Sequence, residues 1–101
     1  MMNPRVYLDV DPRTLRLPNS RRFGADPLKL HRQIAAFGKS VQGMPSLEVS
    51  RGTDDALVLN NGVTRATRVA MLLPGTFVQV EVIDDLPVPL ASYPSIGDLV
   101  P

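Results

Sequence analysis

Proline and glycine interrupt this chain so often that only short helices and strands can form. The 101 residues include ten prolines and seven glycines. Proline cannot continue a helix interior or donate to a strand ladder, and glycine weakens both kinds of element. A chain of this length makes one domain, and its 44% of hydrophobic residues is enough for one core. We therefore expect a single domain built from short elements.

Composition excludes several classes of protein. The formal net charge is +1, whereas general nucleic-acid binders carry a strong basic excess, so any nucleic-acid contact must be local. The absence of cysteine excludes disulfides, thiolate nucleophiles and cysteine zinc sites. No apolar run approaches the roughly 20 residues of a membrane span, and residues 1–10 lack the pattern of a secretion signal. We expect a soluble, cytoplasmic protein with no membrane partner.

Hydrophobic periodicity predicts the strands. Alternation of apolar and polar residues is typical of half-buried strands, and a continuous apolar run is typical of a strand covered on both faces. The predicted strands are residues 6–10, 14–17, 46–50, 56–59 and 76–83. In the second strand, Leu15 and Leu17 should face the same way. The third and fourth strands should form a hairpin, with the fourth strand in the centre of the sheet.

Two helices are predicted. In the first, Asp26 can cap the free N–H groups, Pro27 suits the first position and Gly38 suits the end. Its inward stripe is Leu30, Ile34 and Phe37, with Lys29 and Arg32 outside that stripe. The second helix covers residues 63–73.

The chain changes character after residue 85. Four prolines occur in residues 86–101, and no periodicity is visible there. We expect residues 1–85 to form the domain and residues 86–101 to form a proline-rich tail, which lies extended across the domain or reaches a partner. The predicted fold class is α+β, a small mixed β-sheet with two packed helices.

One junction breaks the local rules of helix formation. A helix start offers unpaired N–H groups and a partial positive charge, which favour acids and bind anions. Here the first two turns hold Arg65 and Arg68, three residues apart, and no acid. Arginine grips phosphate oxygens with two donors at once, so a bound anion would reverse the unfavourable charge. We predict a phosphate site formed by Asn61, Gly62, Thr64, Arg65 and Arg68, and no metal site.

Structural alternatives stay open for these residues. Arg65 and Arg68 can be solvated, or can pair with Asp54, Asp55 or an acid of the tail. Gly62 can be required only for its backbone angle. Two further arginines, Arg21 and Arg22, can line the same groove or belong to a solvated basic loop.

The order of short motifs resembles that of a known superfamily. The run Asn61-Gly62-Val63-Thr64-Arg65 is followed by a helix, Pro74-Gly75 and a strand to Ile83. Upstream lie Val10-Asp11-Pro12 with Leu15, a helix ending at Gly38, and the strand opening Met44-Pro45-Ser46-Leu47-Glu48-Val49. Over most of the chain this order resembles the ParB N-terminal and sulfiredoxin-like domains, which also include ParB-like nucleases.

The resemblance implies a ligand and leaves the reaction open. In that superfamily the Gly-x-x-Arg turn binds nucleotide phosphates, so Gly62 and Arg65 match the phosphate-binding pair, with Arg68 as a helper one turn on. The implied ligand is a nucleotide such as CTP or ATP, no other cofactor is required, and a role for Mg²⁺ is left open. Asn61 and Val63 stand where many members carry acids, and the sulfiredoxin cysteine is absent. The resemblance therefore implies a degenerate member.

Three functions follow from these patterns. The first is binding of a nucleotide or nucleic-acid phosphate with weak or absent catalysis. The second is a ParB-like nuclease or nucleotide hydrolase, which needs a metal-binding acid, for which Asp9, Asp54 and Asp55 are the candidates. The third is a protein-interaction module that uses the proline-rich tail or an exposed strand edge.

Overall fold

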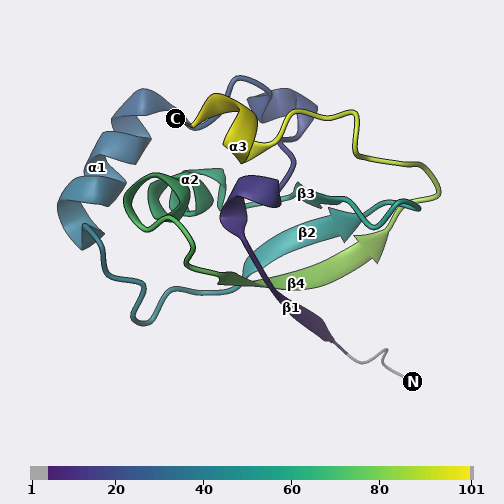
Figure 1. Cartoon of the computed structure of the whole chain (residues 1–101), viewed down its shortest axis with the longest axis horizontal. Coiled ribbons are helices and arrows are strands. Elements are labelled where there is room, and N and C mark those ends of the chain that lie inside the picture. Colours follow the sequence, from purple (N-terminus) through teal and green to yellow (C-terminus); the bar gives the residue numbers. More distant parts are fainter. Residues whose placement is uncertain (1–4, 101) are drawn as a thin grey trace.

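The protein is a small α+β domain with one mixed sheet and its helices on one side (Figure 1). The computed structural model describes residues 5–100. The strands are β1 (Val6–Val10), β2 (Leu47–Arg51), β3 (Leu57–Leu59) and β4 (Val78–Asp85). The helices are α1 (Pro27–Phe37), α2 (Val63–Leu72) and α3 (Ile96–Leu99), with two 3-10 turns, η1 (Pro12–Thr14) and η2 (Asn19–Arg21). The α+β class is confirmed, but this part of the chain holds three α-helices where two were expected.

The sheet has the strand order β1-β4-β2-β3. The pairs β1–β4 and β2–β3 are antiparallel, and β4 runs parallel to β2. The predicted β2–β3 hairpin is therefore confirmed, whereas the central position of β3 is wrong. All three residues of β3 are nevertheless buried, because residues 15–17 cover its outer edge through hydrogen bonds between Arg16 and the backbone of Leu57 and Leu59.

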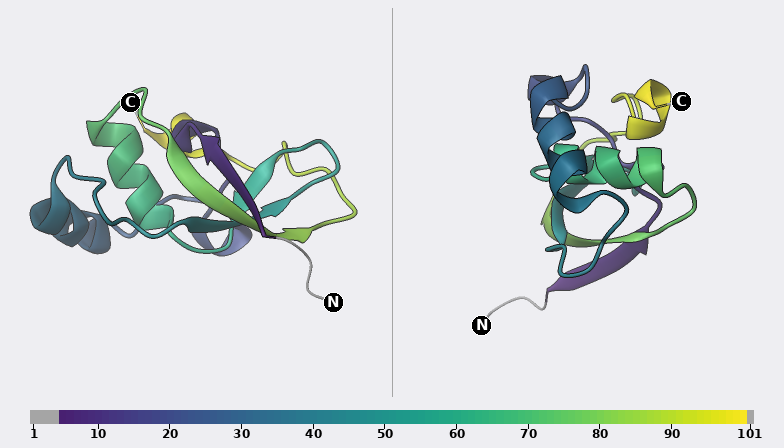
Figure 2. Two further views of the ribbon diagram at one scale, coloured as in Figure 1. Left: turned by 90° about the horizontal axis from the view of Figure 1, so that it is seen from below. Right: turned by 90° about the vertical axis from the view of Figure 1, so that its left-hand side faces the viewer.

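Helix α2 supplies the helical half of the core. Ala66, Val69 and Ala70 are buried in one cluster with apolar residues of β2, β3 and β4. Helix α1 packs on α2 and lies farther from the sheet (Figure 2). As a result α1 has no buried residue, and Phe37 of the predicted inward stripe is 53% exposed.

The predicted strand at residues 14–17 is mostly wrong. Asp11 accepts a hydrogen bond from the Arg13 N–H and, with Pro12 at the first position, starts the 3-10 turn η1. Only Arg16 keeps a bridge geometry, between Val58 on one side and Ser95 on the other. Leu15 and Leu17 both enter the core, as expected from their spacing.

The segment after β4 packs on the domain, which is one of the two placements expected for the tail, but it also contributes to the core and forms a helix, which was not expected. Leu90, Ile96 and Val100 are buried, and the last two belong to the core cluster. Ser95 and Asp98 form a capping box that starts α3, the helix that sequence patterns missed. The Asp54 carboxylate accepts hydrogen bonds from the N–H groups of Leu90 and Ala91. Among residues 5–100, no helix is long and apolar enough to cross a bilayer.

Candidate functional site

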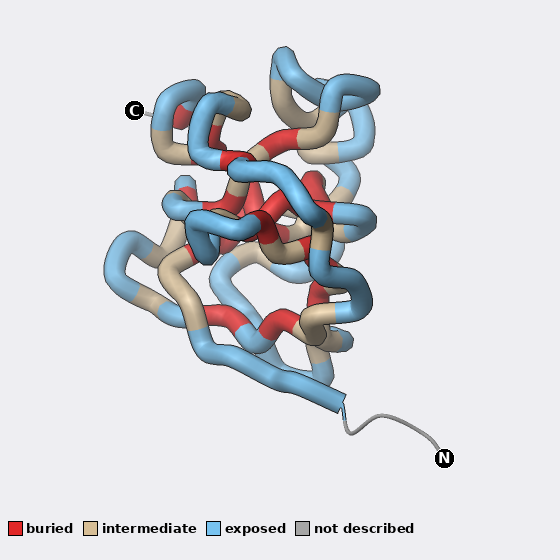
Figure 3. Tube along the Cα trace, turned by 90° about the vertical axis from the view of Figure 1, so that its right-hand side faces the viewer, coloured by how far each residue is buried: buried red, intermediate tan, exposed pale blue. Residues whose placement is uncertain are grey.

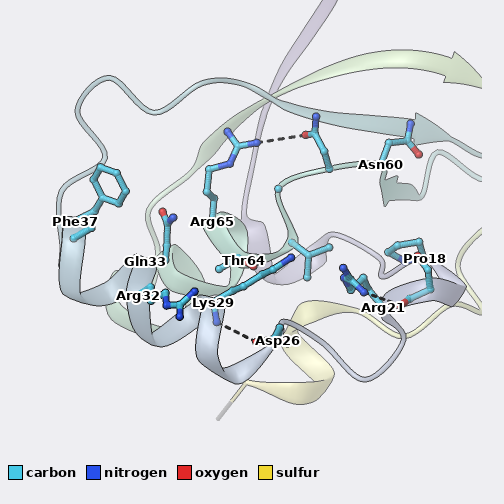
Figure 4. A pocket seen from close by; sticks show the side chains of 15 residues that line it. Pro18, Arg21, Asp26, Lys29, Arg32, Gln33, Phe37, Asn60, Thr64 and Arg65 are labelled. Carbon is cyan, nitrogen blue, oxygen red and sulfur yellow. Dashed lines mark hydrogen bonds between the residues drawn. The ribbon is translucent and has the colours of Figure 1, made fainter.

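A pocket of about 670 Å³ lies between α1, η2 and the turn that starts α2 (Figure 4). Its walls therefore come from segments that are far apart in the sequence, residues 18–21, 26–37 and 60–65. The predicted residues Asn61, Gly62, Thr64 and Arg65 all line it. The structure thus brings most of the predicted site together in one hollow.

The floor of this pocket is the N-terminus of α2. Gly62 precedes the helix with φ 85° and ψ 18°, and no side chain caps the turn. The first helical hydrogen bond runs from the Ala66 N–H to the Gly62 carbonyl. The N–H groups of Val63, Thr64 and Arg65 consequently have no acceptor within residues 5–100. Helices α1 and α3, in contrast, are capped by Asp26 and Ser95.

Positive side chains surround this uncapped helix end. Arg65 comes from α2, Lys29 and Arg32 come from α1, and Arg21 comes from η2 (Figure 4). In the part of the chain that the structure describes, none of these four forms an ion pair with a carboxylate. Unpaired like charges around a positively polarised helix end are unfavourable unless an anion joins them.

Asp26 is the one acid that lines the pocket, and its carboxylate is already engaged. One oxygen accepts hydrogen bonds from the N–H groups of Lys29, at 3.1 Å, and Leu28, at 2.9 Å. These bonds, with the charges of Lys29 and Arg21, lower the pKa of Asp26 against the opposing effect of desolvation. Asp26 therefore stays ionised as a helix cap, and four cations facing one anion leave the pocket an excess of three positive charges.

Arg65 is held at the rim by backbone and amide oxygens. Its Nη1 donates to the Pro45 carbonyl at 3.1 Å, and its Nη2 makes a long contact of 3.5 Å with Asn61 Oδ1. Asn61 itself is tied to β2, because its Oδ1 accepts from the Glu48 N–H and its Nδ2 donates to the Glu48 carboxylate. Asn61 therefore positions the turn, and Arg65 keeps donors for another molecule.

Arg68 does not join Arg65, which corrects the expected pair of guanidinium groups. Its side chain is buried, and its Nη1 donates to the carbonyls of Gly38 and Ser40 at 2.7 and 2.8 Å. The guanidinium lies over the Phe37 ring, and desolvation lowers the pKa of Arg68. Arg68 thus ties the end of α1 to α2, and it lies outside the lining of the charged pocket.

Gly62 has a structural reason of its own. Its φ of 85° lies in the left-handed region, and a Cβ at this position would collide with the Leu47 side chain and approach Arg65 Nη2 to 3.1 Å. The glycine is therefore required for the turn, whether or not a ligand binds there.

The basic loop divides between two roles. Arg21 lines the pocket, whereas Arg22 is absent from the lining and its guanidinium lies 4.8 Å from the centre of the Phe23 ring. Sequence analysis missed Lys29 and Arg32 as site residues. With Gln33 and Ala36 they occupy positions i, i+3, i+4 and i+7, the spacing of one helix face, and all four line the pocket. The helical spacing of Lys29, Arg32 and Gln33 was the sequence signal that could have identified this helix face as part of the site.

The acids considered for metal-assisted hydrolysis lie elsewhere. Asp9, Asp54 and Asp55 are all absent from the pocket lining. Asp54 binds the N–H groups of Leu90 and Ala91, and these bonds contribute to its lowered pKa. No group of three metal-ligating side chains occurs among residues 5–100.

A second pocket, of about 500 Å³, adjoins the first at Arg65. The two share Gln33, Phe37, Asn61 and Arg65 in their linings. The second adds the apolar residues Met44 and Pro45 and the charged residues Glu48 and Arg68. The apolar side chains of Phe37, Met44 and Pro45 therefore lie next to the positively charged pocket, among polar neighbours. Comparison of the chain with protein-family models, curated proteins and solved structures found no match.

Proposed function

We propose that this domain binds a phosphate-bearing ligand, a nucleotide or a nucleic acid, in the pocket between α1 and the start of α2, with weak or absent catalysis. One observation carries the proposal. Three N–H groups without acceptors lie at the uncapped start of α2, and their residues line a pocket that is also lined by Lys29, Arg32 and Arg21. Phosphate oxygens accept from backbone N–H groups and from arginine, so one phosphate can satisfy both.

The resemblance to ParB and sulfiredoxin-like domains agrees with this proposal, but the proposal depends on the geometry of the pocket. That superfamily binds nucleotide phosphates at a Gly-x-x-Arg turn, which corresponds to Gly62 and Arg65 here. We assign the ligand contacts to Gly62, Thr64 and Arg65 of that turn and leave Arg68 out, because its side chain is buried and its Nη1 donates to two carbonyls of the protein. Lys29 and Arg32 take the place that Arg68 was expected to fill.

The adjoining pocket favours a nucleotide over inorganic phosphate. Phe37 is 53% exposed and belongs to both linings, and Met44 lies in the second pocket. Aromatic rings stack on bases of any sequence, and methionine adapts to flat apolar surfaces. A base in the second pocket would leave its phosphates beside Arg65.

Calorimetric titration tests the proposal. CTP, ATP, a single-stranded oligonucleotide and inorganic phosphate are titrated into the wild type, Arg65→Ala and Lys29→Ala, with Arg22→Ala as the matched control outside the pocket. We expect at least one nucleotide or oligonucleotide to bind, with affinity that falls as salt rises. The loss of one charge-assisted contact should weaken binding about 10- to 100-fold in Arg65→Ala.

Arg22→Ala should bind like the wild type. Wild-type protein that binds none of these ligands at low salt would refute the proposal. Equal weakening in Arg22→Ala and Arg65→Ala would show that only the overall charge acts, and would refute the assigned site.

A further inference from the structure

Strand β1 offers the one uncovered edge of the described sheet. The order β1-β4-β2-β3 places β1 and β3 at the two edges. Residues 15–17 cover β3 through the Arg16 N–H, which donates to the Leu57 carbonyl, and the Arg16 carbonyl, which accepts from Leu59. For β1, no backbone hydrogen bond beyond its ladder with β4 is found within residues 5–100. Every second residue of β1 therefore keeps a free N–H and carbonyl on its outer side.

Lysine, proline and a bulge, three of the usual protections of an edge strand, are missing from β1, although the strand is short and contains Asp9. Proteins blunt such edges with lysine, proline, a bulge or a covering segment. Residues 6–10 contain neither lysine nor proline, and their register with β4 is continuous from Val6 to Val10. Val6 and Leu8 are each 36% exposed and Tyr7 is 43% exposed. Figure 3 shows this strand as an exposed segment at the margin of the molecule.

The sequence of this edge is complementary to itself. Arg5, Tyr7 and Asp9 point to one face of the strand, and Val6 and Leu8 point to the other. In an antiparallel pairing of two copies centred on Tyr7, Arg5 lies opposite Asp9 of the second copy and Val6 lies opposite its Leu8. Odd-numbered residues then pair with odd-numbered residues, and even-numbered with even-numbered. The N–H and carbonyl groups on the outer edges of the two strands therefore face each other, and each side chain stays on the same face of the sheet as its partner.

Other registers lose these contacts. A shift of one residue places Val6 of one copy opposite the second copy's Tyr7 or Asp9, which lie on the other face. A two-residue shift keeps the faces but leaves Arg5 opposite Tyr7, or beyond the end of the partner strand. Within residues 5–10, only the register centred on Tyr7 joins the two opposite charges and the two apolar residues at once.

We propose that two copies of this chain associate through β1, antiparallel and centred on Tyr7, to form a continuous sheet across a two-fold axis. The pairing is only five residues long, and stable interfaces bury roughly 1,200–2,000 Å². The dimer is therefore weak and depends on protein concentration. Its contacts share no residue with the charged pocket between α1 and α2.

Charge reversal at the two ends of the pairing tests the register. Arg5→Asp places a carboxylate opposite Asp9, and Asp9→Arg places a guanidinium opposite Arg5, so each variant repels its own copy. Arg5→Asp also removes a 3.9 Å ion pair between Arg5 and Glu81 of the same chain, which Asp9→Arg leaves in place. Both positions are exposed, and circular dichroism checks that each variant folds. Sedimentation equilibrium from about 10 µM to about 1 mM should show concentration-dependent dimers of the wild type.

We expect each single variant to dimerise at least about 10-fold more weakly, because like charges directly opposite are unfavourable. An equimolar mixture of Arg5→Asp and Asp9→Arg restores both opposite-charge contacts and should regain dimers near the wild-type level. Wild type that remains monomeric throughout would overturn the proposal. Charge reversals without effect would overturn the edge as the interface, and a mixture that stays monomeric would overturn the register.

Discussion

Two arginines three residues apart in α2 should respond in opposite ways to truncation. Arg65 lies at the rim of the charged pocket and donates to one carbonyl, that of Pro45. Arg68 is 2% exposed and donates to two carbonyls, those of Gly38 and Ser40. We predict that Arg68→Ala mainly lowers the free energy of unfolding, and that Arg65→Ala mainly lowers affinity for phosphate ligands.

The expected magnitudes follow from these contacts. Hydrogen bonds from a charged donor contribute about 1.5–3 kcal/mol each. The lower value suits Arg68, because Ser40 is an exposed residue and the buried Nε of Arg68 has no partner within residues 5–100. Two such bonds give a loss of about 3 kcal/mol for Arg68→Ala, or roughly 12–24 °C in Tm for a domain of this size. Arg65→Ala removes one hydrogen bond at the surface, to the Pro45 carbonyl, for which water competes, and should cost about 1 kcal/mol or less.

Thermal unfolding followed by circular dichroism, with calorimetric titration of the best nucleotide, separates the two effects. At a temperature where Arg68→Ala is folded, it should bind within about 3-fold of the wild type, whereas Arg65→Ala should bind about 10- to 100-fold more weakly. The reasoning fails if Arg68→Ala keeps the wild-type Tm and loses binding, because Arg68 would then face the ligand.

Three further predictions concern the turn, the acid response and the C-terminal segment. Gly62→Ala should destabilise by about 2–4 kcal/mol through its φ of 85° and the clash with Leu47, whereas Gly75→Ala, with the same φ and open space, should cost about 1–2 kcal/mol in urea unfolding. Hydrogen bonds, chiefly from the Leu90 N–H, make the pKa of Asp54 lower in the folded protein than in the unfolded chain. The unfolded chain therefore takes up a proton first as pH falls. The resulting stabilisation is present above about pH 4 and is lost as pH falls through the folded pKa. Asp54→Asn should therefore flatten the decline of Tm between about pH 6 and pH 3, unlike Asp84→Asn, and an equally steep decline would contradict this. Leu90→Ala should lower unfolding free energy by about 2–5 kcal/mol, because Leu90 is 2% exposed, and a change below about 0.5 kcal/mol would show a detachable tail.

Regular elements with strong local signals were predictable from the sequence. Helix α1 begins after the Asp26 cap and ends before Gly38, as expected. The β2–β3 hairpin and α2 also form where the patterns placed them. In these cases the capping residues and the apolar period act over a few positions, so tertiary contacts do not override them.

Elements that depend on distant contacts were not predictable. The first of these is residues 14–17, whose hydrogen bonds go to β3 and to the C-terminal segment. The second is α3, since four residues are too few to show a helical period. Leu90, buried among prolines, likewise donates its N–H to the carboxylate of Asp54, which is 36 residues away in the sequence.

The site was predictable only in part. The turn with Gly62 and Arg65 breaks local rules, and this signal is visible in the sequence. The positions of Arg68 and Lys29 depend on how α1 packs on α2, because that packing turns one side chain inward and the other toward the turn. Helical spacing alone treats Arg65 and Arg68 as neighbours, whereas the fold assigns Arg68 to the connection after α1.

The most direct test of the phosphate site is an NMR titration of amide proton and nitrogen shifts with CTP, ATP and inorganic phosphate. The account predicts that the N–H signals of Val63, Thr64 and Arg65 move most and that they saturate together, because these groups have no acceptor within residues 5–100. The signals of α3, which is capped by Ser95, should stay in place. Shifts confined to other surfaces, or unchanged signals at residues 63–65 while ligand binds, would contradict the account.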